Sequence, residues 1–153
     1  MKDVLFQEEK LSEIIEEIKP LLYEHWQEIG IFDRDKHPLD PDWDLYFKAE
    51  CAGIHFCLTA RQDGKLIGYY SSFLLPKHFH YRSIYASDCD LFFLVPEYRT
   101  GLIGLNMLRE AENVLKRKGV NMITHTVKVS FPLEPIMKRL GFKAMDIKYF
   151  KEV

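Results

Sequence analysis

The sequence lacks three features that often indicate a class of function directly: a strong net charge, paired cysteines and a long apolar run. Its 21 lysines and arginines stand against 23 acidic residues, which gives a net charge of −2 and no basic excess of the kind nucleic-acid binders carry. The three cysteines form no CxxC pair that could hold zinc. No apolar run approaches the ~20 residues of a membrane-spanning helix. We therefore expect neither a nucleic-acid nor a membrane partner.

The cysteines and the amino end indicate a cytoplasmic protein. Cys51, Cys57 and Cys89 are odd in number and lie in apolar surroundings, as reduced core residues do. Acidic residues interrupt the apolar residues of the amino end, so we expect no signal peptide. With 153 residues, of which 47% are hydrophobic, the chain has the size of one ordinary domain with its own core. We predict a single domain over residues 1–153.

The first third of the chain is predicted to be helical. Apolar residues recur at helical spacing over residues 11–26, with glutamates on the opposite face. Pro20 lies within this stretch, so we expect either one kinked helix or two helices joined there. Residues 33–46 are rich in Asp and Pro, which predicts a long loop that leads into a second helix near Pro41 or Asp42.

The rest of the chain alternates strands and helices. Two apolar runs around an Asp63-Gly64 turn predict an antiparallel hairpin. Residues 89–95 are apolar on both faces, as in a buried central strand. Further along we predict a helix over 104–118, a strand over 120–127, a short helix over 130–140 and a final strand over 141–152. This order predicts an α+β (α/β/α) fold, in which helices flank a mixed, mostly antiparallel central sheet.

The turn between the buried strand and the next helix carries an arginine and two glycines. The first turn of a helix leaves N–H groups without partners, and their dipoles sum to about half a positive charge. Gly101 and Gly104 would let phosphate oxygens approach these amides, and Arg99 would add a charge-assisted contact. The stretch therefore predicts a phosphate or pyrophosphate site. The alternative is structural: Gly101 serves the loop, and Gly104 allows close packing of helix on strand.

Pro96 ends the buried strand and indicates that two strands separate there. Proline cannot donate to a sheet ladder, and a bulge or divergence would leave backbone groups of Phe93, Leu94 and Val95 free. An extended ligand could pair with these groups like an added strand. A ligand with a pyrophosphate and a linear, amide-bearing arm fits both features, and coenzyme A is such a molecule.

Residues 91–112, LFFLVPEYRTGLIGLNMLREAE, resemble motif A of the GNAT superfamily of acyl-CoA N-acyltransferases. Arg99 and Gly104 match the first and last positions of that motif. Leu102 stands where the family commonly has a glycine, and the glycine has moved to Gly101. Residues 135–142, PIMKRLGF, resemble the late helix of the family, and PKHFHY before the motif is similar to members from phages and bacteria.

The resemblance implies the fold of that family, with two strands splayed at the cofactor site. It also implies an N-acetyltransferase with acetyl-CoA as co-substrate, in which a primary amine of a small molecule or protein attacks the thioester directly. Many members dimerise, so the resemblance also allows a homodimer. By the same resemblance the cofactor would contact Phe93, Leu94, Val95, Arg99, Thr100, Gly101, Leu102, Ile103 and Gly104.

The general acid of the family has no direct counterpart here. Many members keep a Tyr in the late helix, where this sequence has Met137, whose thioether cannot donate a proton. Tyr149 is a substitute candidate, although a Tyr on a terminal strand often only packs its ring. Otherwise the thiolate of CoA is protonated from water.

The general base has two candidates. Asp88 precedes the buried strand, at a position comparable to the Glu base of some family members, and is equally suited to capping a turn. By strand alternation we expect it to share a face with Asp90, Phe92 and Leu94. His125 could face the cleft and titrate near neutrality, or be a hydrogen-bonded core residue.

Two other functions remain open. The missing Tyr is compatible with a catalytically silent GNAT fold that binds acyl-CoA or a protein. His78, His80 and His125 would suit a metal-dependent hydrolase, but no third ligand stands at a sensible spacing from the first two, so we expect no metal. The acidic residues of the long loop could attract a cationic amine such as a polyamine, or simply be solvated.

Overall fold

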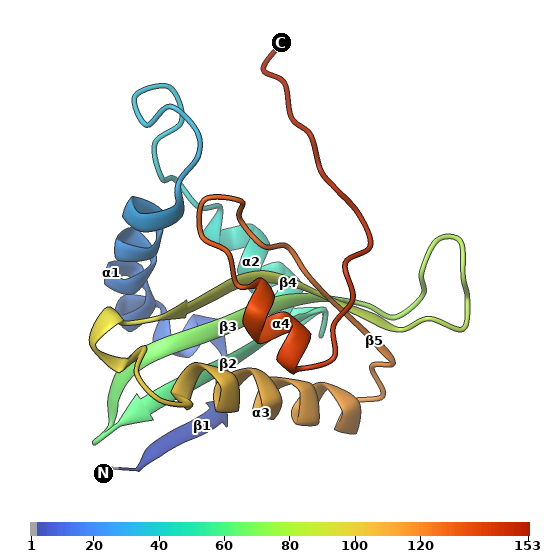
Figure 1. Cartoon of the computed structure of the whole chain (residues 1–153), viewed down its shortest axis with the longest axis horizontal. Helices are drawn as coiled ribbons and strands as arrows, with labels where there is room; N and C mark the ends of the chain where they lie inside the picture. The colour runs from blue at the N-terminus through green and yellow to red at the C-terminus, as the bar shows by residue number, and fades with distance from the viewer. Residues whose placement is uncertain (1–2) are drawn as a thin grey trace.

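A five-stranded sheet with the strand order β1-β2-β3-β4-β5 forms the centre of the protein (Figure 1). The structure is a computed structural model that describes residues 3–153. Strands β1 to β4 pair antiparallel, and β5 pairs parallel with β4. The strands are β1 (Val4–Glu8), β2 (His55–Gln62), β3 (Lys65–Leu75), β4 (Ala86–Leu94) and β5 (Met122–His125). The helices are α1 (Leu11–Ile29), α2 (Trp43–Cys51), the 3-10 helix η1 (Pro96–Tyr98), α3 (Ile103–Arg117) and α4 (Glu134–Arg139).

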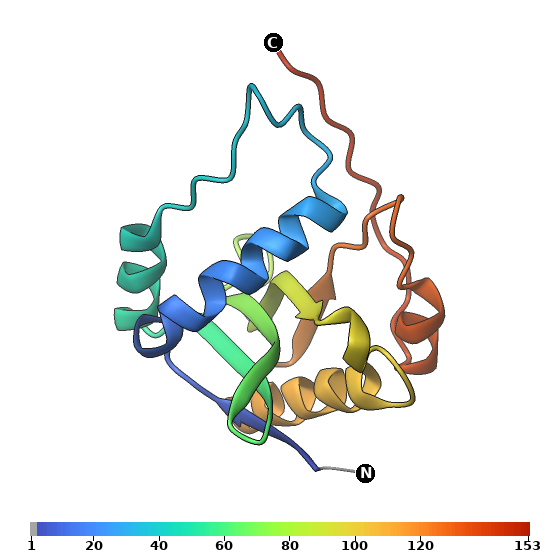
Figure 2. The ribbon, with the colours of Figure 1, turned by 90° about the vertical axis from the view of Figure 1, so that its left-hand side faces the viewer.

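Helices cover both faces of the sheet. Figure 2 shows α1 and α2 on one face and α3 and α4 on the other. The buried residues of α1 follow the helical spacing of the sequence pattern: Leu11, Ile14, Ile18 and Leu22. Those of α3 do the same: Leu105, Met107, Leu108, Ala111 and Leu115. This layering confirms the predicted α+β fold with a mixed, mostly antiparallel sheet.

The hairpin turn and the start of the second helix lie where the sequence predicts them. Asp63 and Gly64 have φ angles of 51° and 81°, which is the positive-φ geometry of a tight hairpin turn, and they join β2 to β3. Asp42 caps α2, because its Oδ1 accepts a hydrogen bond from the Leu45 N–H at 2.9 Å. The hairpin and the start of the second helix are both confirmed.

Pro20 lies within one continuous helix, α1, and does not divide it. Its ring is exposed, whereas Ile18 and Leu22 on either side are buried against the sheet. The apolar face therefore stays in register with the core on both sides of the proline, and burial holds the helix together across the missing hydrogen bond. Within residues 3–153, no helix combines the length and the apolarity needed to cross a bilayer.

The two ends of the chain differ from the sequence prediction. The sequence did not predict strand β1 near the amino end. The predicted final strand is wrong: residues 143–153 form neither helix nor strand and are exposed, and they leave the body of the fold in Figure 1. Apolar and polar residues alternate there as in a strand, but no strand among the described residues pairs with them, so Met145 and Ile147 are 71% and 78% exposed.

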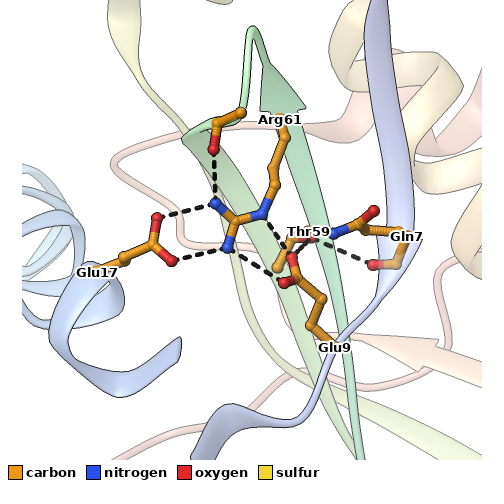
Figure 3. A network of polar contacts seen from close by, with 6 residues as sticks. Gln7, Glu9, Glu17, Thr59 and Arg61 are labelled. Atoms are coloured by element: carbon orange, nitrogen blue, oxygen red, sulfur yellow. Dashed lines mark hydrogen bonds and ion pairs between the residues drawn. The ribbon is translucent and has the colours of Figure 1, made fainter. Parts of the chain in front are cut away.

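One arginine ties the edge of the sheet to α1 (Figure 3). Arg61 of β2 donates from Nε to Glu9 at 2.7 Å and from Nη1 to Glu17 at 2.8 Å. Nη1 also donates to the carbonyl oxygen of Gly64 at 2.8 Å. Hydrogen bonds from Arg61 lower the pKa of Glu17. The guanidinium thus joins the segment after β1, the helix α1 and the hairpin turn.

Candidate active site

Strands β4 and β5 pair over a short distance and then separate. Their parallel pairing ends at Cys89 opposite His125, whereas β4 continues to Leu94. The last five residues of β4 therefore extend beyond the end of β5, and no strand among the described residues pairs with their outward edge, where the Arg99 side chain bonds the Leu94 carbonyl. The separation confirms the predicted splay, which begins earlier in β4 than the expected position next to Pro96.

A cleft of about 620 Å³ occupies the space where the strands separate. Its walls come from elements on both faces of the sheet. His25 and Glu28 of α1 line it from one face, and residues of α3 and α4, among them Leu105 and Met137, line it from the other. The cleft therefore reaches through the sheet at the splay.

The amino end of α3 forms one end of this cleft. Leu102 is the N-cap residue, and no side chain caps the helix. The first helical bond joins the Asn106 N–H to the Leu102 carbonyl at 2.8 Å, so the preceding N–H groups of the first turn have no partner within the helix. With the positive end of the helix dipole, they form an environment suited to an anion.

The two glycines of the motif have different roles. Gly101 has a φ of 66° and open space around the position of a Cβ, so it supplies the left-handed turn into α3 and leaves the backbone accessible. A Cβ at Gly104 would lie 3.8 Å from Phe92 and 3.9 Å from Leu94. Gly104 thus lets α3 lie close against β4, as in the structural alternative, while it also lines the cleft.

Arg99 is engaged by protein groups on the cleft wall. Its Nε donates to the Leu94 carbonyl at 2.7 Å, and Nη2 donates to Glu28 at 2.6 Å, with Nη1 bonded to the same carboxylate. These hydrogen bonds lower the pKa of Glu28. The guanidinium also lies 5.3 Å from the Phe93 ring centroid and 5.6 Å from that of Phe131. Its charge is therefore compensated by Glu28 across the cleft.

The backbone of β4 alternates between β3 and the cleft. The Val95 N–H donates to the Ile67 carbonyl of β3 at 2.9 Å. In an antiparallel pair the next residue points its backbone groups the other way, and the Leu94 carbonyl accordingly bonds Arg99. Leu94, and by the same alternation Phe92, face the cleft with their backbone. Val95, and by the same alternation Phe93, face β3, so the prediction of free backbone groups at these two residues is wrong.

The nine residues predicted to contact the cofactor lie together at the end of β4 and the start of α3. The cleft lining includes six of them: Phe93, Leu94, Arg99, Gly101, Leu102 and Gly104. Val95, Thr100 and Ile103 lie between these residues in the chain and outside the lining.

Of the three residues predicted to handle protons, His125 lines the cleft. Its ring packs edge-on against Phe142 at 4.9 Å and near Tyr70 at 5.7 Å. Burial lowers the pKa of His125 from 6.5 to about 4. The imidazole is therefore neutral at neutral pH. Tyr149 is 90% exposed in the carboxyl-terminal segment and lies outside the lining.

Asp88 does not share a strand face with Phe92 and Leu94, so that prediction is wrong. The β3–β4 register places Asp88 opposite Phe73 and Leu91 opposite Ser71, and shifts by one residue between them. This β-bulge reverses the alternation. Asp88 lies outside the cleft lining, and its Oδ1 accepts a hydrogen bond from the Thr124 hydroxyl at 2.7 Å.

Several cleft residues were missed at the level of sequence. Asp90, at the bulge, could not be placed without knowing the register. His25 could have been found, because it continues the buried spacing of α1; its Nδ1 lies 2.9 Å from the Tyr69 hydroxyl. Lys128 and Arg139 also line the cleft and add two cations, but neither belongs to a recognisable pattern.

His78 and His80 lie between β3 and β4, with their ring centroids 5.7 Å apart. In the described part of the chain, no three His, Cys, Asp or Glu residues come together as a metal site.

Comparisons with known proteins address the same region. The family model described as "Acetyltransferase (GNAT) family" matches residues 13–142. A search of curated protein sequences finds no significant match.

Similar solved structures include a protein of Clostridium acetobutylicum with acetyl-CoA, described as a predicted acetyltransferase. It has 15% identity and a TM-score of 0.73 over 98% of this chain and 96% of the other. Glucosamine-6-phosphate N-acetyltransferase from Arabidopsis thaliana follows at 14% identity and 0.72, over 99% of both chains. An aminoglycoside acetyltransferase from a soil metagenome, in complex with sisomicin, has 13% identity and 0.72, over 98% and 96%. At these identities the structures show a shared fold, and the family model shows the membership: the chain belongs to the acetyltransferase (GNAT) family.

Proposed function

We propose that the protein transfers an acetyl group from acetyl-CoA to an amino group of a small molecule or a protein. The observation that carries this proposal is the cleft between β4 and β5, which ends at the uncapped first turn of α3. Family membership supports it, as does the acetyl-CoA in the similar structure from Clostridium acetobutylicum. The free state of Cys51, Cys57 and Cys89 supports the expected cytoplasmic location.

The diphosphate of the cofactor would bind the amides at the start of α3. Gly101 and Gly104 line the cleft without a side chain that would hold phosphate oxygens off the backbone. Since the charge of Arg99 is compensated by Glu28, we assign the added positive charge to Lys128 and Arg139 of the cleft wall. Arg99 then positions α1 against the site.

The pantetheine arm would run along β4 from α3 toward Cys89. The backbone groups of Phe92 and Leu94 face this path, by the alternation described above. Five residues of β4 span about 16 Å between Cys89 and the end of the strand, at about 3.3 Å each. An extended, amide-bearing arm can pair with such an edge, and it would displace the Arg99 side chain from the Leu94 carbonyl.

In the reaction, the nitrogen of the acceptor forms a bond to the thioester carbonyl carbon, and the carbon–sulfur bond breaks. An ammonium substrate gives up two protons in total, one to the thiolate of CoA and one to solvent, which balances the step. We assign His125 of the cleft wall to accept a proton from the acceptor's amino group and pass it on to solvent. Its low pKa, about 4, makes it a weak base, suited to relay a proton and not to hold it. Met137 of the cleft wall cannot donate, so solvent water carries the proton from the ammonium to the thiolate.

A pair of variants at the N-cap tests the cofactor site. Leu102→Asp adds a capping carboxylate, which stabilises α3 but places a negative charge where the diphosphate would bind. Leu102→Asn caps in the same way without the charge. We expect the Asp variant to bind acetyl-CoA about tenfold more weakly than the Asn variant because of its charge. The Asn variant should bind less tightly than the original protein, because its side chain occupies one of the amides, and both variants should melt no earlier than the original protein. Calorimetric titration measures the affinity. Equal affinity of the Asp variant would refute a diphosphate at this helix end.

A panel of amines with acetyl-CoA, read by release of free thiol, tests turnover. Release with at least one amine is the expected result. Binding of acetyl-CoA without release across the panel would instead support a silent binding module, the alternative that Met137 leaves open.

A further inference from the structure

The bulge in β4 lies where the two strands part. Cys89 pairs with Ser72 of β3 and is also the last residue of β4 that pairs with β5. Leu91 pairs with Ser71, so Asp90 stands between two successive pairs without an opposite residue. Bulges re-aim a side chain and are frequent next to active sites. Here the re-aimed side chain is a carboxylate that lines the cleft.

The carboxylate of Asp90 is held from one side. Its Oδ2 accepts a hydrogen bond from the Tyr46 hydroxyl of α2 at 2.7 Å. Tyr46 is fixed by rings on three sides, with centroid distances of 5.8 Å to Trp43, 5.6 Å to His55 and 5.6 Å to Phe73. Burial and the bond to Asp90 raise the pKa of the phenol, which therefore remains a donor. Among residues 3–153 no hydrogen bond to the other carboxylate oxygen, Oδ1, is found, and the residue is exposed.

Asp90 is the carboxylate of the cleft whose charge is not compensated. The lining holds one other acidic residue, Glu28, which pairs with Arg99. Throughout residues 3–153, no lysine, arginine or histidine forms an ion pair with Asp90. The nearest counterpart along the strand, Asp88, is bonded to Thr124 and lies outside the lining. An uncompensated carboxylate in a cleft attracts a cation.

The position of Asp90 separates the roles of the two ends of the cleft. The amides of α3 that suit an anion lie at the open end of the splay, and Asp90 lies at the closed end, next to Cys89. The partner of its carboxylate, Tyr46, comes from α2, on the opposite face of the sheet from α3. A cation would therefore reach Asp90, at the closed end of the cleft, from the α1–α2 face of the sheet. An anionic ligand would occupy the open end of the cleft, at the start of α3.

We propose that Asp90 binds an ammonium group of the acceptor, with Tyr46 as its positioning residue, and that the acceptor carries a second amino group beside the one that is acetylated. This assignment rests on the proposed acetyl transfer and names its substrate class: diamines and larger polyamines. The charged group is held at Asp90 while the neutral amine attacks the thioester.

The test compares 1,5-diaminopentane with pentylamine, which has the same carbon chain and one amino group. Thiol release is measured for the original protein, Asp90→Asn, Tyr46→Phe and the control Asp44→Asn, which removes an exposed carboxylate of α2. Asparagine keeps the size of the side chain and an oxygen for the Tyr46 hydroxyl, and melting temperatures check the fold of each variant.

We expect the original protein to prefer the diamine through a lower KM. Asp90→Asn should raise the KM for the diamine about tenfold and leave the KM for pentylamine unchanged. Tyr46→Phe should raise the KM for the diamine less, again without an effect on pentylamine. Asp44→Asn should match the original protein. An equal effect of Asp90→Asn on both amines, or no preference in the original protein, overturns the proposal.

Calorimetry of 1,5-diaminopentane with CoA-loaded protein separates this proposal from acetyl transfer itself. Binding that weakens in Asp90→Asn supports the ammonium site, even if no thiol is ever released, in which case only the proposed reaction fails. Thiol release together with diamine binding that is equal in both proteins overturns the ammonium site and leaves the reaction intact.

Discussion

His25, which is buried, and His125, which is half-buried, should make the protein sensitive to mild acid. Burial lowers the pKa of His25 and of His125 from 6.5 to about 4. Because the folded pKa lies below the unfolded value, the unfolded chain binds the proton first. The stability that each neutral imidazole contributes is thus complete above pH 6.5 and is lost as the pH falls toward 4.

The size of the effect follows from the change in pKa. A fall from 6.5 to about 4 corresponds to at most about 3 kcal/mol per histidine. Between about pH 7.5 and about pH 5, some 2 kcal/mol of this is lost per histidine. The free energy of unfolding, from urea denaturation without ligand at each pH, should therefore fall by about 4 kcal/mol through these two residues.

Variants assign the loss to each residue. His25→Gln and His125→Gln do not titrate in this range, so each should lower the pH dependence of the unfolding free energy by about 2 kcal/mol. His37 is the control, because its side chain is 53% exposed, and His37→Gln should keep the original dependence. If His25→Gln and His125→Gln lose stability on acidification as steeply as the original protein, the neutral imidazoles of these two residues are not the cause.

Two further predictions concern the scaffold. Gly68→Ala should lower the free energy of unfolding by about 1–3 kcal/mol, because its Cβ would lie 2.7 Å from the Phe93 carbonyl oxygen; a melting temperature equal to that of the original protein would contradict this packing. Asp42→Ala should lower the free energy of unfolding, measured by urea denaturation, by about 1 kcal/mol, because the cap on the Leu45 N–H is lost. Asp42→Asn should keep most of this free energy, because asparagine can also cap. Equal stability of the two variants would count against the cap.

The elements with strong local signals were predictable from the sequence. The amphipathic spacing of α1 and α3, the Asp63-Gly64 turn and the cap at Asp42 are each decided by neighbours within a few residues. Strand β1 was missed because five residues carry too little periodicity, and its pairing partner lies far along the chain. The wrong final strand has the opposite origin: its alternation is strand-like, but a strand needs an edge to pair with, and local sequence does not supply one.

In the candidate site, too, the features set by local sequence were predictable and those that depend on distant elements were not. Arg99 to Gly104 could be read as an anion site, because a helix start and its glycines are local features. The compensation of Arg99 by Glu28 joins residues of two distant elements and has no local signal. The face of Asp88 was wrongly predicted because one bulge changes the parity of every residue beyond it. The same bulge brings Asp90 into the cleft.

The contacts of Arg61 have a consequence for association between molecules. Strand β1 covers the outer edge of β2 over five residue pairs, and only Val4 and Phe6 of β1 pack against the core. Arg61, through Glu9, fastens the chain directly after β1. Where this bond is lost, β1 can detach and leave the backbone of β2 as an open template for a strand of another molecule. The guanidinium thus helps to keep β1 on the sheet, and with it the cover over the backbone of β2.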